Sequence, residues 1–115
     1  MNLTSNDQGD CRIISVGEDR IDAVVAIQFK DRMRELTDDS PARIVVDMSK
    51  VVFLDSSGLG AVVAAMKHVG AGKRLELAGL TMAVAKVFRL TRMDTVFTVH
   101  ADVATALGAG LADAS

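Results

Sequence analysis

The stretch RIVVDMSKVVFLDSSGLGAVVAAMKH, residues 43–68, contains the change of pattern that decides the fold. Its first part, residues 43–48, is a run rich in β-branched side chains, which is typical of a strand buried on both faces. Further on, apolar residues recur at helical spacing: Leu59, Val62, Val63, Met66 and Val69. Gly70 and Gly72 then end that helix. Between strand and helix lies FLDSSGLG, residues 53–60, which combines an acid, two hydroxyls and two glycines.

The same two patterns alternate along the rest of the chain. Strands are predicted over residues 11–16, 74–78 and 95–99. A helix that has Asp22 as its N-cap is predicted from one apolar face: Val25, Phe29, Met33 and Leu36. Two later helices are indicated by further apolar sets: Val84, Val87 and Phe88 in one, and Val103, Leu107 and Leu111 in the other.

Strands that alternate with helices of ten or more residues run mostly parallel, because each helix returns the chain across the sheet. We therefore predict an α/β fold with a mostly parallel sheet of about four to five strands and about four flanking helices. Residues 11–112 form this single domain, and residues 1–10 are predicted to be a flexible polar tail. Ligands and partners of such sheets bind past the carboxyl ends of the strands, where Asp55 and Ser56 fall.

The composition limits the kinds of function. The 115 residues suffice for one domain with a buried core, but not for a second. With 13 basic and 15 acidic side chains and no Trp or Tyr, the chain lacks the positive field and the stacking platforms of nucleic-acid binding proteins. Cys11 is the single cysteine, which excludes an internal disulfide and fits a reducing compartment. The polar first residues are unlike a secretory signal, and the longest uncharged apolar run, residues 58–66, is too short to span a bilayer. We expect a cytoplasmic protein that binds neither nucleic acid nor membrane.

The simplest interpretation of FLDSSGLG is a helix cap. Asp55, Ser56 or Ser57 accepts a hydrogen bond from an unpaired amide of the helix that starts near Gly58, which stabilises it by about 1 kcal/mol. A cap needs one short polar residue, so the second hydroxyl and the two glycines remain unexplained.

A catalytic serine is a second interpretation. The nucleophile elbow of hydrolases needs Gly two residues before the serine, but Leu54 and Asp55 occupy those positions. His68 lies about 16 Å of helical rise from the motif and is out of reach as a base. His100 follows the last predicted strand, so a hydrolase would have to pair Ser56 with His100.

The two remaining interpretations involve phosphate. Gly58 and Gly60 begin like a dinucleotide-binding turn, but Val63 takes the place of the third glycine and no P-loop lysine follows. A phosphate carried by Ser56 itself would be favoured at a helix N-terminus by about 0.3 to 2 kcal/mol. Burying that phosphate beside Asp55 under a partner would cost several kcal/mol, and each 1.4 kcal/mol is about tenfold in affinity. One modification would thus release a complex without unfolding the domain.

The residues of this motif also resemble a known family. RIVVDMSKVVFLDSSGLGAVVAAMKH resembles the signature of STAS domains, in particular bacterial anti-sigma factor antagonists. RIDA at residues 20–23 and LTRMDTVFTVH at residues 90–100 are similar to two further stretches of that family. The resemblance implies a STAS-like fold and a binding module that is not an enzyme and holds no cofactor or metal.

The resemblance further implies a partner-switching cycle in which Ser56 is phosphorylated. The unphosphorylated domain captures a partner that is both an anti-sigma factor and a GHKL-type serine kinase; phosphorylation ends the capture, and a PP2C-type phosphatase restores it. The contact surface implied for the partner comprises Asp22, Asp47, Asp55, Ser57, Gly58, Leu59 and Gly60. The alternative is a STAS subunit of another assembly, in lipid transport or a signalling scaffold, without phosphorylation. The chain is expected to be a monomer or a weak homodimer.

This chain departs from the family at two places. Asp19 stands where a glycine usually precedes Asp22 by three residues. Arg92 and Met93 replace a Gly-Leu pair, so a left-handed helix stop there requires a non-glycine residue at some cost. A basic row at spacings of three is either a solvated face or a contact for an acidic partner: Lys86, Arg89 and Arg92.

Overall fold

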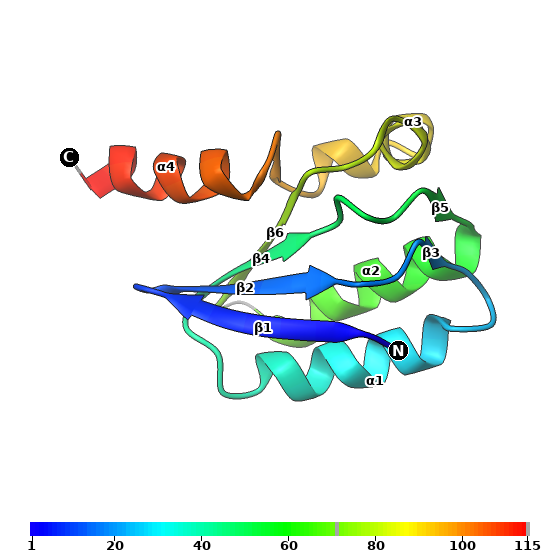
Figure 1. Cartoon of the computed structure of the whole chain (residues 1–115), viewed down its shortest axis with the longest axis horizontal. Helices are drawn as coiled ribbons and strands as arrows, with labels where there is room; N and C mark the ends of the chain where they lie inside the picture. The colour runs from blue at the N-terminus through cyan, green and yellow to red at the C-terminus, as the bar shows by residue number, and fades with distance from the viewer. Residues whose placement is uncertain (71, 115) are drawn as a thin grey trace.

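The structure, a computed structural model, describes residues 1–70 and 72–114, with side chains as far as residue 108 (Figure 1). The elements in chain order are β1 (Leu3–Gln8), β2 (Cys11–Val16), β3 (Arg20–Ile21), α1 (Ala26–Thr37), β4 (Arg43–Asp47), β5 (Phe53–Leu54), α2 (Ser56–Val69), β6 (Arg74–Ala78), α3 (Met82–Leu90), the 3₁₀ turn η1 (Met93–Thr95), β7 (Val99–His100) and α4 (Val103–Ala114). Each parallel strand of the main sheet is followed by a helix, as the alternating pattern predicts.

The main sheet has five strands in the order β1-β2-β4-β6-β7. The last four of these run parallel, and β1 runs antiparallel to β2. A separate parallel pair, β3 with β5, continues the chain beyond the carboxyl ends of β2 and β4. The prediction of an α/β fold with a mostly parallel sheet is confirmed.

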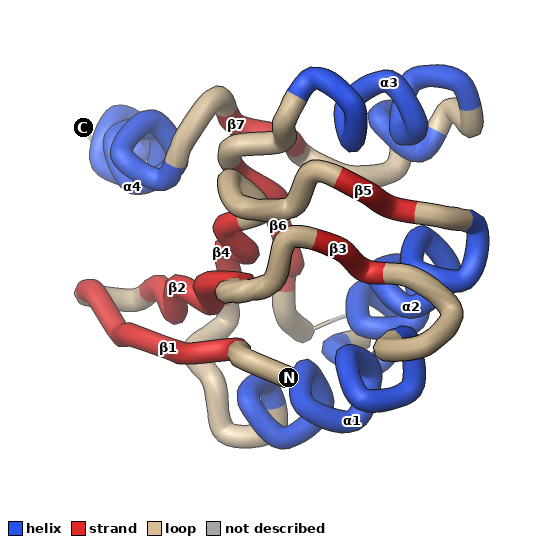
Figure 2. Tube along the Cα trace, turned by 45° about the vertical axis from the view of Figure 1, so that its right-hand side comes forward, coloured by secondary structure: helices blue, strands red, loops and turns tan. Residues whose placement is uncertain are grey.

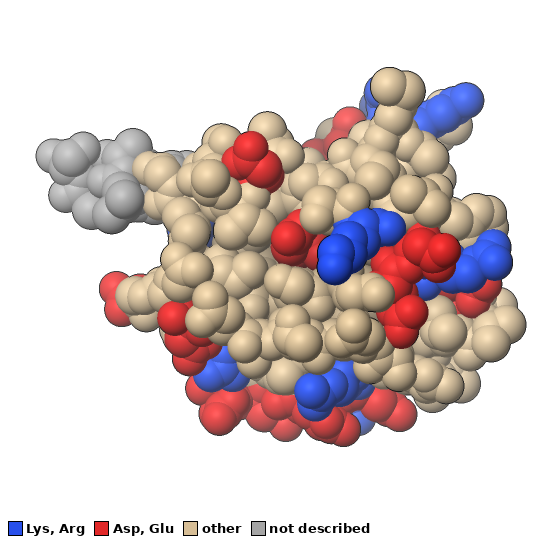
Figure 3. All heavy atoms as spheres, in the orientation of Figure 1, with Lys and Arg blue, Asp and Glu red and all other residues tan. Residues whose placement is uncertain are grey.

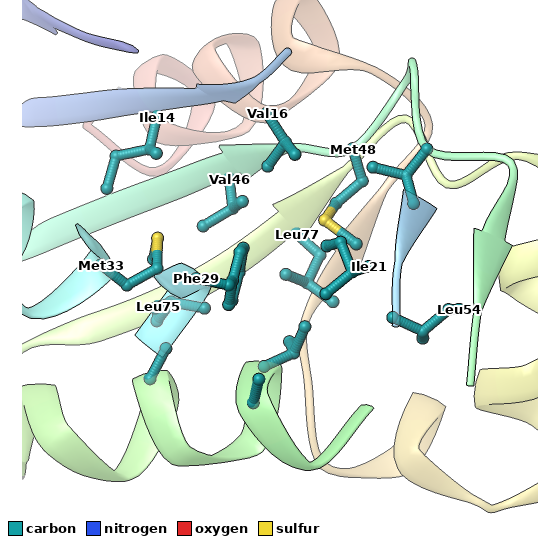
Figure 4. Packing of buried hydrophobic residues seen from close by; sticks show 14 of the residues in the cluster. Ile14, Val16, Ile21, Phe29, Met33, Val46, Met48, Leu54, Leu75 and Leu77 are labelled. Atoms are coloured by element: carbon teal, nitrogen blue, oxygen red, sulfur yellow. The ribbon is translucent and has the colours of Figure 1, made fainter. Parts of the chain in front are cut away.

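The two faces of the main sheet are covered by different helices, α1 and α2 on one face and α4 on the other (Figures 1 and 2). Side chains alternate between the faces along each strand. Ile14 and Val46 point into the larger core, where they meet Phe29 and Met33 of α1 (Figure 4). The smaller core beneath α4 takes the intervening strand residues and one helix residue: Cys11, Ile13, Val45, Ala78 and Ala106. Helix α2, which carries the motif, therefore rests on the larger core.

The N-terminal residues correct the expectation of a flexible tail. They form β1, which pairs with β2 through a two-residue loop in which Gly9 has a φ of 60°, a conformation that glycine adopts without strain. Leu3 is buried, and the other residues of the strand face solvent. The strand is tied down by Arg12 of β2, whose guanidinium lies 2.7 Å from Asp7 and 2.9 Å from Asp39. Because one side chain of β1 is buried and the others face solvent, its sequence lacks the alternation of apolar and polar residues from which a strand is predicted.

Helix α1 begins at Ala26, three residues later than an N-cap at Asp22 predicts. Asp22 instead opens a turn: its carbonyl accepts a hydrogen bond from the Val25 N–H (3.1 Å) and its carboxylate one from the Val24 N–H (3.1 Å). The predicted face is otherwise correct, because Phe29 and Met33 are buried.

The last strand is also shorter than the predicted 95–99. The N–H groups of Val96 and Phe97 both donate to the carbonyl of Met93 (3.0 and 3.1 Å), so they are not available to the sheet. The Phe97 ring enters the larger core, 5.7 Å from the ring of Phe88. β7 therefore begins at Val99.

The predicted C-terminal helix is confirmed as α4, although the side chain of Leu111 lies outside the described residues. Among the residues that the structure describes, no helix combines the length and the apolar character needed to cross a membrane.

Candidate partner-binding site

The candidate site lies where β3 and β5 meet the first turn of α2, at one end of the molecule (Figure 1). In the β3–β5 pair, Arg20 is opposite Phe53 and Ile21 is opposite Leu54. Ile21 and Leu54 are buried, so Arg20 and Phe53 face outward, with the guanidinium 5.0 Å from the ring centroid. The next residues along the two strands, Asp22 and Asp55, reach the same exposed edge.

Asp55 joins two segments through its carboxylate. Oδ1 accepts a hydrogen bond from the Gly58 N–H (2.8 Å), which caps α2, and Oδ2 accepts one from the Ala23 N–H (3.1 Å), which fixes the turn before α1. The prediction that one of three polar residues caps the helix is confirmed, with Asp55 as the cap. The helix accordingly begins at Ser56, two residues before the predicted start.

Because Asp55 supplies the cap, the two serines are not needed for it. Ser56 and Ser57 are both exposed and occupy the first two positions of α2. Within the described part of the chain, neither hydroxyl takes part in a hydrogen bond. The unpaired amides and partial positive charge of a helix N-terminus surround these hydroxyls.

The two glycines of the motif lie on opposite sides of α2, one buried and one exposed. Gly58 is buried, and a Cβ there would lie 1.9 Å from the carbonyl oxygen of Ile21, so the close approach of α2 to β3 requires glycine. Gly60 is exposed, and a Cβ there would meet nothing within 4 Å. Leu59 between them is partly buried against the larger core. Of these three predicted contact residues, only Gly60 is freely accessible.

The two other predicted aspartates lie in different places. Asp22 is beside Asp55, since Ala23 bonds to Asp55, and its Oδ2 lies 3.2 Å from Nε of Arg20. Asp47 accepts a hydrogen bond from the Ser49 N–H (3.0 Å) in its own turn. It lines a polar pocket of about 280 Å³. The other lining residues lie in or next to β1 and β2 and in the turn after β4: Asn2, Thr4, Ser15, Val16, Gly17, Ser49 and Lys50. The structure therefore brings Asp22 to the serines and gives Asp47 a separate pocket.

A buried ionic cluster under α4 was not apparent from the sequence. Oε1 of Glu76 lies 2.8 Å from Nη2 of Arg43 and 2.8 Å from Nε2 of His100, and Arg43 also donates to the carbonyl of Ala106 in α4 (2.7 Å). Burial by itself raises the pKa of Glu76, but the hydrogen bonds from Arg43 and His100 outweigh it, and the pKa lies below its usual value. The alternation of RLELA places Glu76 on the face of β6 opposite Leu75 and Leu77, and the sequence does not show that α4 covers that face.

The same cluster bears on the hydrolase alternative. His100, the only candidate base, is engaged with Glu76 on the α4 face, whereas Ser56 begins the helix that covers the opposite face. Cys11 is a buried strand residue, and burial raises the pKa of its thiol. Among residues 1–70 and 72–114, no three His, Cys, Asp or Glu side chains gather as metal ligands would.

Large apolar side chains lie exposed on the elements that meet at this edge. Their exposed fractions are 82% for Val24, 68% for Ile27, 57% for Val52, 44% for Phe53 and 90% for Met82. We call these five residues the edge patch. They belong to the turn before α1, the first turn of α1, β5 with its preceding residue, and the start of α3. Figure 3 shows acidic and basic groups side by side at the same end of the molecule. Exposed apolar groups rimmed by charge are typical of protein interaction sites.

Comparison with known proteins gives a consistent family match. A family model described as the STAS domain matches residues 2–106. The anti-sigma-F factor antagonist RsfB of two Mycobacterium tuberculosis strains is 25% identical over 105 residues, which is 91% of this chain and 85% of RsfB.

Solved structures agree with this match. An anti-sigma factor antagonist from Mycobacterium paratuberculosis superposes with a TM-score of 0.84 at 27% identity, covering 94% of this chain and 92% of that one. SpoIIAA, described as an anti-sigma factor antagonist and as a Bacillus cell fate determinant, shares the fold at 19% identity in its unphosphorylated form, with a TM-score of 0.73 over 92% and 93% of the two chains. Its phosphorylated form gives a TM-score of 0.67 at 18% identity over 93% and 97%.

Proposed function

This chain belongs to the STAS domain family, and from that membership we propose that it is an anti-sigma factor antagonist controlled by phosphorylation of Ser56. In this proposal the unmodified domain binds an anti-sigma factor that is also a GHKL-type serine kinase. Phosphorylation by that partner ends the binding, and a PP2C-type phosphatase restores it. One observation carries the proposal: Asp55 supplies the helix cap, so the Ser56 hydroxyl is left exposed and unbonded beside the edge patch.

An exposed hydroxyl at this position is a suitable phosphate acceptor. The kinase must reach Ser56, and its exposure allows this without local unfolding. The resulting phosphate would lie against the unpaired amides of α2, an interaction of about 0.3 to 2 kcal/mol. We therefore expect the phosphorylated domain to remain folded.

The same phosphate would oppose a bound partner. Asp22 and Asp55 already place two carboxylates at the edge, and a partner that covers the edge patch would have to bury the phosphate beside them. A buried charge without a matched cation costs several kcal/mol. Since about 1.4 kcal/mol is tenfold in affinity, one phosphate suffices to release the partner.

The domain supplies a substrate hydroxyl and no catalytic group in this proposal. ATP is bound by the kinase, and the domain itself needs no cofactor. Cytoplasmic location follows from the partners, because sigma factors and their regulators act on transcription there. The alternative, a STAS subunit of another assembly without phosphorylation, predicts that Ser56 is dispensable.

The test is affinity capture from the native organism with three baits: wild type, Ser56→Asp and Ser5→Asp. Ser5→Asp is the matched control, because it makes the same substitution at an exposed serine of β1, outside the contact surface. Recovery of an anti-sigma factor kinase by wild type and by Ser5→Asp, but not by Ser56→Asp, supports the proposal. Identical partner sets with all three baits contradict the switch and favour the alternative.

A further inference from the structure

Helix α3 presents a mixed basic and apolar face to solvent. Met82, Lys86, Arg89 and Leu90 are all exposed, and their spacing of four, three and one places them on one side of the helix. Met82 is 90% exposed and Leu90 is 71% exposed. The opposite side of the helix packs into the larger core through Val84 and Phe88. We call these four residues and Arg92, which follows the helix, the α3 strip.

The cations of the α3 strip differ from most arginines elsewhere in the described part of the chain, although Arg34 of α1 likewise has no ion pair there. Arg12, Arg20, Arg32, Arg43 and Arg74 each pair with an internal carboxylate. Within the part of the chain that the structure describes, Lys86, Arg89 and Arg92 make no ion pair, and the sequence of α3 contains no acidic residue. The helix dipole favours a cation in the last turn, such as Arg89, but gives no reason for Lys86 in the middle of the helix.

Arg92 is kept in a backbone conformation that favours glycine. Its φ and ψ are 59° and 19°, and it is the one described non-glycine residue with positive φ. The turn needs this conformation, because the Arg92 carbonyl accepts the Thr95 N–H (3.2 Å) that begins η1. A strained residue that glycine would relieve is a sign that its side chain has a use.

The α3 strip is continuous with the proposed binding edge. Thr81 Oγ1 donates to the carbonyl of Val51 (2.7 Å), which fixes the start of α3 to the segment that leads into β5. Met82 thereby belongs to the edge patch and to the α3 strip. Figures 1 and 2 both show α3 beside β5.

We infer that the α3 strip is a second part of the partner interface, which selects an anti-sigma factor by binding an acidic segment of it. The segment carries carboxylates opposite Lys86, Arg89 and Arg92, with apolar side chains against Met82 and Leu90. This inference rests on the proposed function, since the occupant is the anti-sigma factor that the edge binds. Complementary charge of this kind gives specificity and association rate, and it weakens with salt.

The experiment measures the affinity of the full chain for the anti-sigma factor recovered by the capture described above. Lys86→Glu/Arg89→Glu is compared with Arg34→Glu/Lys67→Glu, which makes the same change of charge near the far ends of α1 and α2. The first variant is expected to weaken binding at least about tenfold at low salt and less at high salt, and the control about twofold or less.

Arg92→Gly separates binding from folding. It removes the side chain and relieves the left-handed backbone, so Tm is expected to stay the same or rise by a few degrees while the affinity falls about threefold or more. A lower Tm with lower affinity would mean that Arg92 acts through the fold, and it would overturn the inference.

The remaining outcomes distinguish this inference from the proposed function. If Ser56→Asp loses the anti-sigma factor but the α3 variants bind as wild type, or no worse than the Arg34/Lys67 control, the inference fails and the proposed function stands. If wild type binds no anti-sigma factor, both fail.

Discussion

Asp55 and Glu76 each join two elements of the chain, but Asp55 does so at the exposed edge of the sheet and Glu76 beneath α4. Asp55 accepts hydrogen bonds from two backbone amides, Gly58 and Ala23, and forms no ion pair with any residue that the structure describes. Glu76 is buried and is matched by Arg43 and His100. The hydrogen bonds to Asp55 therefore hold the exposed edge together while the negative charge of this carboxylate stays unmatched. Beneath α4, the charge of Glu76 is matched by its neighbours. A charge added by modification would therefore act on a partner most directly at the exposed edge.

The largest effect is expected from the close contact that supports the edge. Gly58→Ala would place a Cβ 1.9 Å from the carbonyl oxygen of Ile21, so α2 or β3 must move. We expect the free energy of unfolding to fall by about 4 kcal/mol or more, measured by urea denaturation. A fall in the free energy of unfolding of about 0.5 kcal/mol or less would show that the β3–β5 pair moves to accommodate the added Cβ at little cost.

The α4 face is expected to respond almost as strongly to the loss of its carboxylate. Glu76→Ala removes the buried carboxylate that Arg43 and His100 share and is expected to cost about 3 kcal/mol. Glu35→Ala is the control, because Glu35 forms an exposed pair with Arg32 and its loss should cost about 0.5 kcal/mol or less. Equal losses in the two variants would remove the distinction between the buried cluster and a surface pair.

The two regions also differ in their expected response to acid. The pKa of Glu76 is lowered in the folded chain, so its contribution to stability is present above the unfolded value near 4.5 and is lost as the pH falls through the folded value. Unfolding free energies of wild type and Glu76→Gln measured between pH 7 and pH 3 should therefore converge on the acid side. Parallel curves would mean that protonation of Glu76 does not contribute to acid unfolding.

A smaller effect is expected at the cap of α2. Asp55→Ala removes the acceptor of the Gly58 and Ala23 amides and should cost about 1 to 2 kcal/mol. Asp55→Asn keeps a side-chain oxygen that caps well, so its thermal stability should stay close to that of wild type. If both variants lose the same amount, the charge of Asp55 matters to the fold more than its hydrogen bonds do.

Most of the fold was predictable because the buried strands and helices have clear apolar periods. The strands at 11–16 and 74–78 and the α2 helix appear where the sequence indicates them. β1 was missed because this edge strand buries one residue, Leu3. β7 was predicted too early in the chain because the amides of Val96 and Phe97 donate to the Met93 carbonyl of η1 and not to the sheet. The pairing of β1 and the position of β7 both depend on tertiary contacts, which cannot be predicted from the local propensity of the residues.

The candidate site was predictable in its motif and less so in its geometry. The spacing of Asp55 and Ser56 indicates a capped helix. The loss of the family's glycine at Arg92 left the backbone of that turn open, and the structure keeps the left-handed stop with arginine in it. The sequence does not tell that Gly58 faces inward while Gly60 faces outward, because both lie in one helical turn. That distinction depends on the position of the Ile21 carbonyl, which β3 brings from a distant part of the chain.

Gly60→Ala is expected to have the smallest effect on stability, and an effect of the opposite sign. Gly60 lies within α2, and a Cβ there meets nothing within 4 Å, so alanine should stabilise the helix by about 0.5 to 1 kcal/mol. The fold therefore gives no reason for glycine at this position, in contrast to Gly58. A partner that approaches the backbone of the first turn closely would supply one. We expect Gly60→Ala to raise Tm and to weaken capture of the anti-sigma factor, with Ala64→Ser, a polar change further along α2, as the control variant. Undiminished capture by Gly60→Ala would remove Gly60 from the interface and restrict the contact surface to the serines and the edge patch.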